Sequence, residues 1–193
     1  MKPMELKQQI LSGAFKETFA WLYGDRAALQ QERYAEAVDQ FASLFGEERD
    51  VRLFSAPGRT EVGGNHTDHQ RGRVLAAGVN LDVIAVAALS DSGVISIQSK
   101  GYPRDIVAVD DLEEKEEERN HACSLVRGMA SRFVQLGYKI GGLDAYTTSD
   151  VLSGSGLSSS AAFEVLIGNL LSGLYNGGAV SPVEIAHARF RPG

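Results

Sequence analysis

Residues 154–162 read Gly-Ser-Gly-Leu-Ser-Ser-Ser-Ala-Ala, and an apolar pattern of helical spacing follows them to Tyr175. Glycine lets a backbone turn sharply and approach a bound group closely, and the start of a helix presents amide N–H groups that favour an anion. The loop therefore predicts a cradle for phosphate. It lacks the Gly-Lys-Ser/Thr ending of a P-loop, so it indicates a different way of binding a nucleotide.

The plainer interpretation of this loop is a strand-to-helix turn in which one serine caps the helix. Three consecutive hydroxyls exceed that need, because serine is a poor helix former and one side chain suffices for a cap. We therefore expect the hydroxyls of Ser158 and Ser160 to contact phosphate oxygens or a Mg²⁺ ion, and Ser160 is the candidate metal ligand. The predicted nucleotide-binding residues are Gly154, Ser155, Gly156, Leu157, Ser158, Ser159 and Ser160.

A second polar segment follows the alternating strand pattern of residues 51–55. Arg59 comes directly after Pro57-Gly58, where its guanidinium is suited to neutralise charge on a transferring phosphoryl group. A surface salt bridge is the ordinary alternative for an arginine.

Residues 65–69, Asn-His-Thr-Asp-His, crowd polar side chains beside two glycines. The carboxylate of Asp68 suits vicinal sugar hydroxyls, because one carboxylate accepts two O–H donors. The segment thus predicts a sugar or small polyol as the other substrate. A metal site is the competing interpretation, although spacing this tight rarely supplies three ligands to one ion, and a polar turn is the plainest one.

The composition places the chain among ordinary globular proteins: 193 residues, 44% hydrophobic, 23% charged, with a net charge of −6. The negative charge argues against non-specific nucleic-acid binding. Cys123 is the one cysteine, which excludes an intrachain disulfide and suits a reducing compartment. No apolar run approaches the roughly 20 residues that span a bilayer. These features predict a cytoplasmic protein without a membrane or nucleic-acid partner.

The periodicity of apolar residues predicts an α+β fold with a mixed or antiparallel sheet and helices packed on it. Two helices precede the first strand, and the order is not a regular β-α-β alternation. Residues 74–89 fit either two strands or one bent strand. The predicted helices span residues 4–22, 26–45, 122–136, 159–175 and 182–189, and the other strands 51–55, 94–98, 105–109 and 142–149.

Taken together, the two motifs resemble those of the GHMP kinase superfamily, and most closely its galactokinase branch. The sugar signature of that branch, Gly-Arg-x-Asn-x-Ile-Gly-Glu-His-Thr-Asp-Tyr-x-x-Gly, corresponds to residues 58–72, and its phosphate loop, Gly-x-Gly-Leu-Ser-Ser-Ser-Ala-Ala, stands unchanged at residues 154–162. The order of the motifs and the strands between them match as well. The resemblance covers the chain from about residue 50 onward.

The resemblance implies the N-terminal half of a GHMP kinase, with a fold like that of ribosomal protein S5 domain 2. It implies that Arg59 stabilises the phosphoryl transfer and polarises the anomeric hydroxyl of the sugar. Asp68 would contact the hydroxyls that distinguish galactose, and the serines of the loop would hold ATP and Mg²⁺. The implied sugar-binding residues are Asn65, His66 and Asp68.

The chain departs from the family pattern at the sugar signature. Asn65 replaces a glutamate that contacts the sugar, and an amide donates as well as accepts hydrogen bonds. Glu61, Gly63 and His69 replace Asn, Ile and Tyr. These changes leave galactosamine, arabinose or a related sugar as alternative substrates.

A catalytic aspartate and a Mg²⁺-ligating glutamate, which family members carry after the phosphate-loop helix, have no counterpart in residues 1–193. We expect one N-terminal kinase domain at residues 1–193, made of a helical segment (1–48), a sugar signature (50–85) and a phosphate loop with its following helices (150–193), without a C-terminal domain. The expected parent activity is ATP-dependent phosphorylation of galactose at its anomeric hydroxyl, and the expected state of this chain is a truncated, inactive form.

A non-catalytic sugar or nucleotide sensor is the alternative from another class. A homodimer is also expected, through apolar residues of the helix at 159–175 that truncation would expose.

Overall fold

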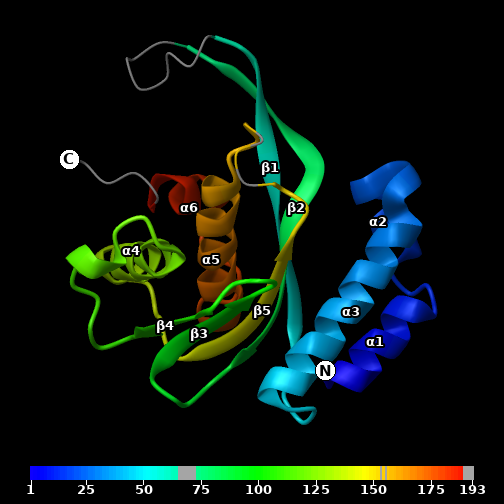
Figure 1. Cartoon of the computed structure of the whole chain (residues 1–193), viewed down its shortest axis with the longest axis horizontal. Coiled ribbons are helices and arrows are strands. Elements are labelled where there is room, and N and C mark those ends of the chain that lie inside the picture. The colour runs from blue at the N-terminus through cyan, green and yellow to red at the C-terminus, as the bar shows by residue number, and fades with distance from the viewer. Residues whose placement is uncertain (65–72, 153, 155, 189–193) are drawn as a thin grey trace.

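Figure 1 shows the computed structural model of the chain, which describes residues 1–64, 73–152, 154 and 156–188. Three helices come first, five strands and a helix follow, and two helices close the described chain. The helices are α1 (Pro3–Leu11), α2 (Lys16–Tyr23), α3 (Ala27–Phe45), α4 (Ala122–Gln135), α5 (Ser159–Tyr175) and α6 (Pro182–Ala188). The strands are β1 (Arg52–Gly63), β2 (Leu75–Leu89), β3 (Val94–Ser99), β4 (Arg104–Ala108) and β5 (Leu143–Ser149).

The five strands form one sheet in the order β1-β2-β5-β3-β4. Every neighbouring pair is antiparallel except β3 and β5, which run parallel with Ser99 opposite Thr147. The predicted α+β class with a mixed sheet is confirmed. Because β3 and β5 are parallel, their C-terminal ends meet at the same edge of the sheet.

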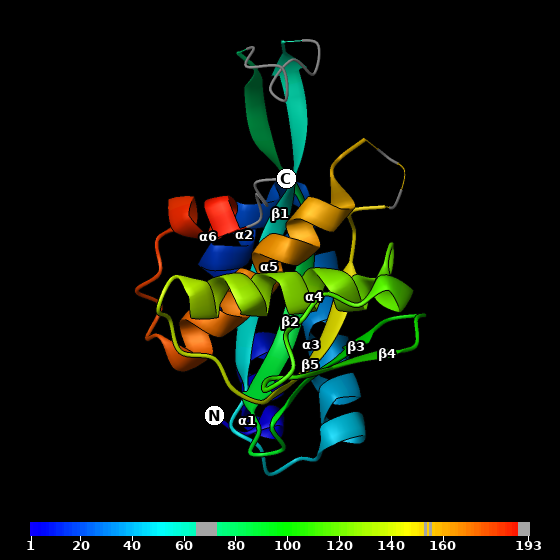
Figure 2. The same cartoon turned by 90° about the vertical axis from the view of Figure 1, so that its left-hand side faces the viewer.

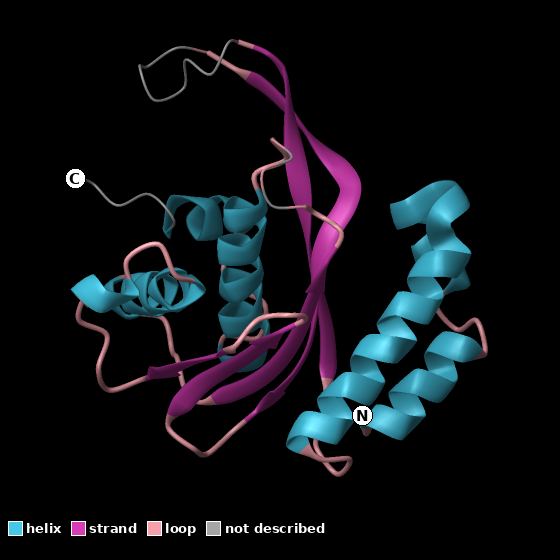
Figure 3. Cartoon of the chain, viewed as in Figure 1, coloured by secondary structure: helices cyan, strands magenta, loops and turns pink. Residues whose placement is uncertain are grey.

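Helices cover both faces of the sheet, as Figures 2 and 3 show. Strand β2 supplies both cores, because its side chains alternate between the two faces. Val83, Ala85 and Ala87 pack toward α4, α5 and α6, whereas Ile84, Val86 and Ala88 pack toward α1, α2 and α3. The whole middle of β2 is therefore apolar, as a strand covered on both faces must be.

The N-terminal helix predicted over residues 4–22 is wrong in one respect, since it consists of two helices. Gly13 has φ +84°, in the left-handed region, and the chain leaves the helix after Leu11 and enters another at Lys16. Both helices keep their apolar residues on the same core, with Ile10 and Phe19 buried. The apolar spacing therefore continued across a turn that it does not encode.

The first strand is longer than predicted, running from Arg52 to Gly63 through Pro57. Proline lacks the N–H that a central strand needs, but β1 is an edge strand with one free side.

Residues 74–89 form a single strand from Leu75, as one of the two interpretations required. The pairing of this strand with β1 is irregular opposite Gly58, because Pro57 pairs with Asp82 but Arg59 pairs with Gly78. This bulge in β2 redirects the hairpin at the point where Arg59 leaves the body of the sheet.

The expected exposed apolar face on α5 is wrong. Ala162, Leu166 and Leu170 are buried in the core that α5 shares with the sheet, α4 and α6. Because other parts of this chain cover these residues, they are not available for contact with a second copy. The homodimer stays a prediction, without an exposed face on α5 to support it. Among the described helices, none combines the length and apolar character needed to cross a bilayer.

Candidate functional site

The loop between β5 and α5 has the backbone that the phosphate prediction requires. Gly154 and Gly156 both have φ +77°, a conformation that side chains with a Cβ disfavour. A Cβ added to either glycine would meet no atom of the described residues beyond its chain neighbours within 4 Å. The loop therefore leaves open space over both glycines, at the N-terminus of a 17-residue helix.

Ser158 bears on the plainer interpretation of the loop, in which a serine side chain caps the helix. It is the N-cap residue of α5, yet its side chain makes no capping hydrogen bond. Its hydroxyl instead accepts a hydrogen bond from Nε of Arg59 at 3.1 Å. Because the helix start is not satisfied by this serine, its amide groups remain suited to an external anion.

Arg59 is held beside the loop by two contacts from different parts of the residue. Besides the side-chain contact, its backbone N–H donates to the carbonyl of Leu157 at 3.1 Å. Gly58 makes this approach feasible, because a Cβ there would lie 3.1 Å from the Leu157 carbonyl oxygen and 3.1 Å from Val151. The arginine thus lies at the N-terminus of α5, where a guanidinium and helix amides converge on one small region.

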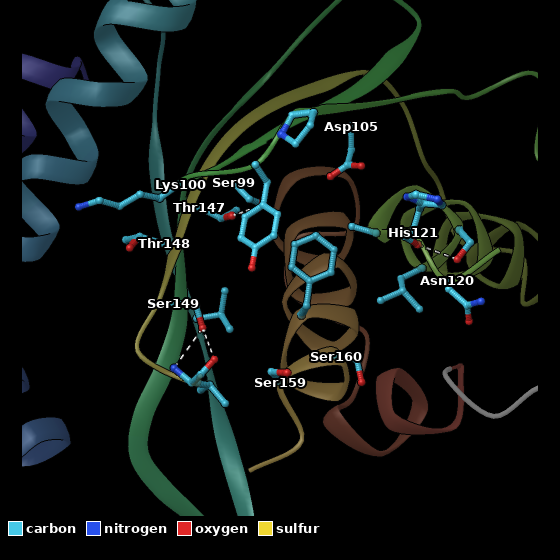
Figure 4. A pocket seen from close by; sticks show the side chains of 18 residues that line it. Ser99, Lys100, Asp105, Asn120, His121, Thr147, Thr148, Ser149, Ser159 and Ser160 are labelled. Carbon is cyan, nitrogen blue, oxygen red and sulfur yellow. Dashed lines mark hydrogen bonds between the residues drawn. The ribbon is translucent and has the colours of Figure 1, made fainter. Parts of the chain in front are cut away.

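A cavity of about 660 Å³ adjoins the first turn of α5 (Figure 4). Its volume falls within the range of small-molecule and cofactor sites. Three parts of the chain supply most of its lining: the β3–β4 turn, the start of α4, and the end of β5 with the start of α5; Val83 of β2 completes it. The lining residues are Val83, Ser99, Lys100, Tyr102, Pro103, Asp105, Asn120, His121, Ala122, Ser124, Leu125, Thr147, Thr148, Ser149, Val151, Ser159, Ser160 and Phe163.

Strained backbone is concentrated around this cavity. Among the described residues, Asn120 and Ser158 are the two non-glycine residues with positive φ, at 66° and 59°. Asn120 lines the cavity and Ser158 directly precedes its lining residue Ser159. Strain of this kind persists where the surrounding structure enforces it, and it clusters at binding and catalytic sites.

Several polar residues that line the cavity interact with partners in the chain. Thr147 donates a hydrogen bond to the Ser99 hydroxyl at 2.9 Å, which joins the ends of β5 and β3. Lys100 turns away from the cavity and pairs with Glu36 of α3 at 2.8 Å (Figure 4). Burial raises the pKa of Asp105 above its ordinary value, and the nearby His121 opposes that rise. The cavity therefore offers both polar groups and apolar side chains, such as Leu125 and Phe163, to a ligand.

The structure brings part of the predicted site together and leaves part of it undescribed. Arg59, Leu157 and Ser158 meet directly, and Ser159 and Ser160 face the cavity. The predictions for Asn65, His66, Asp68 and Ser155 lie outside the described residues. The alternative metal cluster at residues 66–69 lies there too. Within the described part of the chain, no group of three His, Cys, Asp or Glu side chains is arranged to hold a metal ion.

Sequence reasoning missed two of the three walls of the cavity. The residues at 99–105 and 120–125 carry no motif that marks them as part of a site. Tyr102-Pro103 is a turn signal at the end of a strand, but its place beside the loop depends on the parallel pairing of β3 with β5. That pairing is not written in any local pattern.

Comparison with known proteins gives two family matches on this chain. The galactokinase galactose-binding signature matches residues 39–89, which contain Arg59 and the polar segment after it. The GHMP kinases N-terminal domain matches residues 124–191, which contain the loop and α5.

Curated relatives and solved structures agree with these matches. Galactokinase of Lactococcus lactis subsp. lactis is 33% identical over 141 residues, which cover 72% of this chain and 35% of that protein. Galactokinase of Clostridium tetani is 28% identical over 151 residues, or 78% and 38% of the two chains. This chain therefore spans about a third of the length of these relatives.

Among solved structures, Lactococcus lactis galactokinase complexed with galactose superimposes with a TM-score of 0.73 at 28% identity, over 81% of this chain and 40% of that one. Methanococcus jannaschii mevalonate kinase gives a TM-score of 0.60 at 13% identity, over 72% and 45%, and shares the fold alone. The loop, the arginine beside it and the mixed sheet that brings them together are thus those of a galactokinase galactose-binding signature followed by a GHMP kinase N-terminal domain.

Proposed function

We propose that this chain supplies the nucleotide site and the transition-state arginine of an ATP-dependent kinase that phosphorylates galactose at its anomeric hydroxyl. The observation that supports this most directly is the contact of Arg59 with Ser158 at the N-terminus of α5, beside a cavity of about 660 Å³. The galactokinase relatives support the class of reaction. The proposal for the sugar rests on the signature at residues 39–89.

The described residues fit a nucleotide. Two glycines with positive φ and open space above them, followed by helix amides, suit the phosphates. The adjoining cavity, with Phe163 and Tyr102 among its lining, suits a base and ribose. Bound ATP would supply the transferred phosphoryl group, and a Mg²⁺ ion would neutralise charge between its phosphates, with the Ser160 hydroxyl as the proposed protein ligand.

The protein's own groups divide the work. The amides at the start of α5 bind and orient the phosphates, and Arg59 places positive charge where negative charge develops during transfer. Asp68 and His66 orient the sugar, and Asp68 accepts hydrogen bonds from two of its hydroxyls. Arg59 lies on β1, and residues 65–69 follow that strand in the sequence.

Two measurements test the proposal. Calorimetry of the 193-residue chain with MgATP tests the nucleotide site, and galactose-dependent ADP release by an active enzyme containing residues 1–193 tests the reaction. Saturable binding of MgATP and preference for galactose over galactosamine and arabinose are expected. Preference for one of the other sugars would favour the second candidate, a kinase for that sugar, for which Asn65 in place of glutamate is the specific indication.

We expect Asp68→Ala to raise the KM for galactose far more than the KM for ATP in the active enzyme. Each hydrogen bond to a charged group is worth about 1.5–3 kcal/mol, and the variant removes a carboxylate proposed to accept two. Steady-state kinetics with each substrate varied in turn provide the check. Equal effects on both substrates would contradict the assignment of Asp68 to the sugar.

We expect Tyr102→Ala to weaken MgATP binding to the 193-residue chain. Tyr102 lines the cavity from the β3–β4 turn, and stacking of a base on an aromatic ring is worth about 1–3 kcal/mol. Trp21→Ala is the matched control, because Trp21 is an 84% exposed aromatic side chain on α2. Calorimetry showing the same loss of affinity in both variants, or in neither, would place the base elsewhere.

A further inference from the structure

A buried polar cluster lies on the face of the sheet that α2 and α3 cover. Its centre is Asp82, which is 3% exposed and lies in β2 directly after the bulge. The Asp82 carboxylate accepts hydrogen bonds from the hydroxyls of Tyr23 and Ser55, and from Nη1 of Arg33 at 2.7 Å. Tyr23 and Arg33 come from the helical layer, whereas Ser55 belongs to β1.

Arg33 extends the cluster to the end of β5. Its Nη2 donates to the carbonyl of Thr148 at 2.8 Å and to the carbonyl of Asp82 at 3.0 Å. Nη1 also lies 3.5 Å from the carboxylate of Asp150, which accepts a hydrogen bond from Gln30 at 2.7 Å. One guanidinium on α3 thus holds two neighbouring strands at the point where the phosphate loop begins.

Three connections lead from this cluster to the candidate site. Ser55 precedes Arg59 by four residues on β1. The backbone N–H of Asp150 donates to the Asp82 carbonyl at 2.9 Å, and the next residue, Val151, packs against Gly58. The bulge that redirects the hairpin at Arg59 ends at Asp82 itself. Movement of the cluster would therefore shift Arg59 and the start of the loop relative to one another.

Stability alone is a weak reason for such a cluster. A buried ion pair costs desolvation that its attraction barely repays, and apolar replacement of both partners is often neutral or stabilising. The hydroxyl of Tyr34 lies 2.8 Å from that of Tyr23, within hydrogen-bond distance. Both tyrosine hydroxyls stay protonated, because burial raises the pKa of Tyr34 to about 12 and that of Tyr23 above its ordinary value. The charge of Asp82 is thus balanced by Arg33, with neutral donors around it.

We infer that Arg33 and Asp82 are positioning residues, which fix the position of Arg59 relative to the phosphate loop. They act through Ser55 on the strand of Arg59 and through Asp150 at the start of the loop. This inference deepens the proposed function and rests on it. It assigns a role to the N-terminal helices, since α3 supplies the guanidinium that fixes the strand ends behind the site.

The chain contains a matched control at the other end of β5. Arg49, which follows α3, donates to the carboxylate of Asp144 at 3.0 Å and to the carbonyl of Leu89. This pair also joins the helical side of the molecule to β2 and β5. Asp144 stands near the start of β5, however, whereas Asp150 directly follows its end. Loss of the Arg49 pair therefore perturbs the same two strands away from the site.

The test compares two double variants of the 193-residue chain, R33M/D82L and R49M/D144L, each of which removes both charges of its pair. We expect R33M/D82L to raise the Kd for MgATP about tenfold or more, in the range of ordinary coupling between sites. We also expect faster hydrogen exchange of the amides of residues 156–162 without nucleotide. R49M/D144L should change the Kd less than about twofold and leave exchange at those amides unchanged.

Equal Kd values and equal exchange at residues 156–162 in the two double variants would overturn the inference and leave the cluster a structural one. If R33M/D82L does not fold, Asp150→Asn compared with Asp144→Asn makes the same comparison at single sites. If the unsubstituted chain binds no MgATP, the proposed function fails, and the exchange measurement still decides whether the cluster orders the loop.

Discussion

Replacing Arg59 by alanine is expected to lower kcat about 10²–10³-fold in an active enzyme containing residues 1–193, the loss typical of removing one donor that stabilises transition-state charge. Arg59 is the described cation that contacts the start of α5, through Ser158. The backbone bond from Arg59 to Leu157 does not depend on the side chain, so the hairpin should stay attached to the loop. The KM for ATP should change much less than kcat, because the contribution is greatest in the transition state.

Arg52→Ala is the control for that result. Arg52 lies on the same strand and is exposed, but it donates to the carbonyl of Gly173 near the end of α5, away from the cavity. Its loss should leave kcat within about twofold, as expected for a surface substitution away from the site. If Arg59→Ala and Arg52→Ala had similar kinetics, the role of Arg59 would be that of a surface residue. Single-turnover measurements separate a slower chemical step from slower product release.

The helices and strands of this chain could be predicted where their apolar residues face a core. The prediction for residues 159–175 coincides with α5, and that for 26–45 with α3 to within a residue. The predictions of element bounds failed where contacts between distant parts of the chain decide the local structure. Nothing in residues 51–63 indicates that their strand lies at the edge of the sheet, a position in which a proline such as Pro57 is tolerated.

The candidate site divides in the same way. The loop at residues 154–162 and Arg59 could be singled out from the sequence because local chemistry marks them: glycines, hydroxyls, and a cation after a strand. The structure places the two in contact, whereas the binding of phosphate there stays a prediction. The walls of the cavity at 99–105 and 120–125 could not, since they reach the loop only when β3 pairs with β5. The cluster around Asp82 is likewise absent from any motif, because its members come from two helices and two strands.

The largest loss of nucleotide binding is expected from Gly156→Val. Gly156 has φ +77°, which a β-branched residue adopts only with strain. Among the residues that the structure describes, and leaving out its chain neighbours, none has an atom within 4 Å of a Cβ placed there, so an added side chain would extend into the space proposed for phosphate. MgATP binding to the 193-residue chain should become undetectable by calorimetry.

A control variant has to separate the backbone strain that valine introduces from the exclusion of phosphate by its side chain. Gly137, in the turn after α4, has φ +83° and no atom within 4 Å of a Cβ, so Gly137→Val imposes a similar backbone cost. Both variants should lose stability to a similar degree, of the order of 1–3 kcal/mol for a residue held in this region, as thermal unfolding would report. MgATP affinity should survive in Gly137→Val alone. If a folded Gly156→Val protein bound MgATP as tightly as the unsubstituted chain does, the phosphates would not bind at this loop. The argument that places Arg59 beside the reacting group would then fail as well.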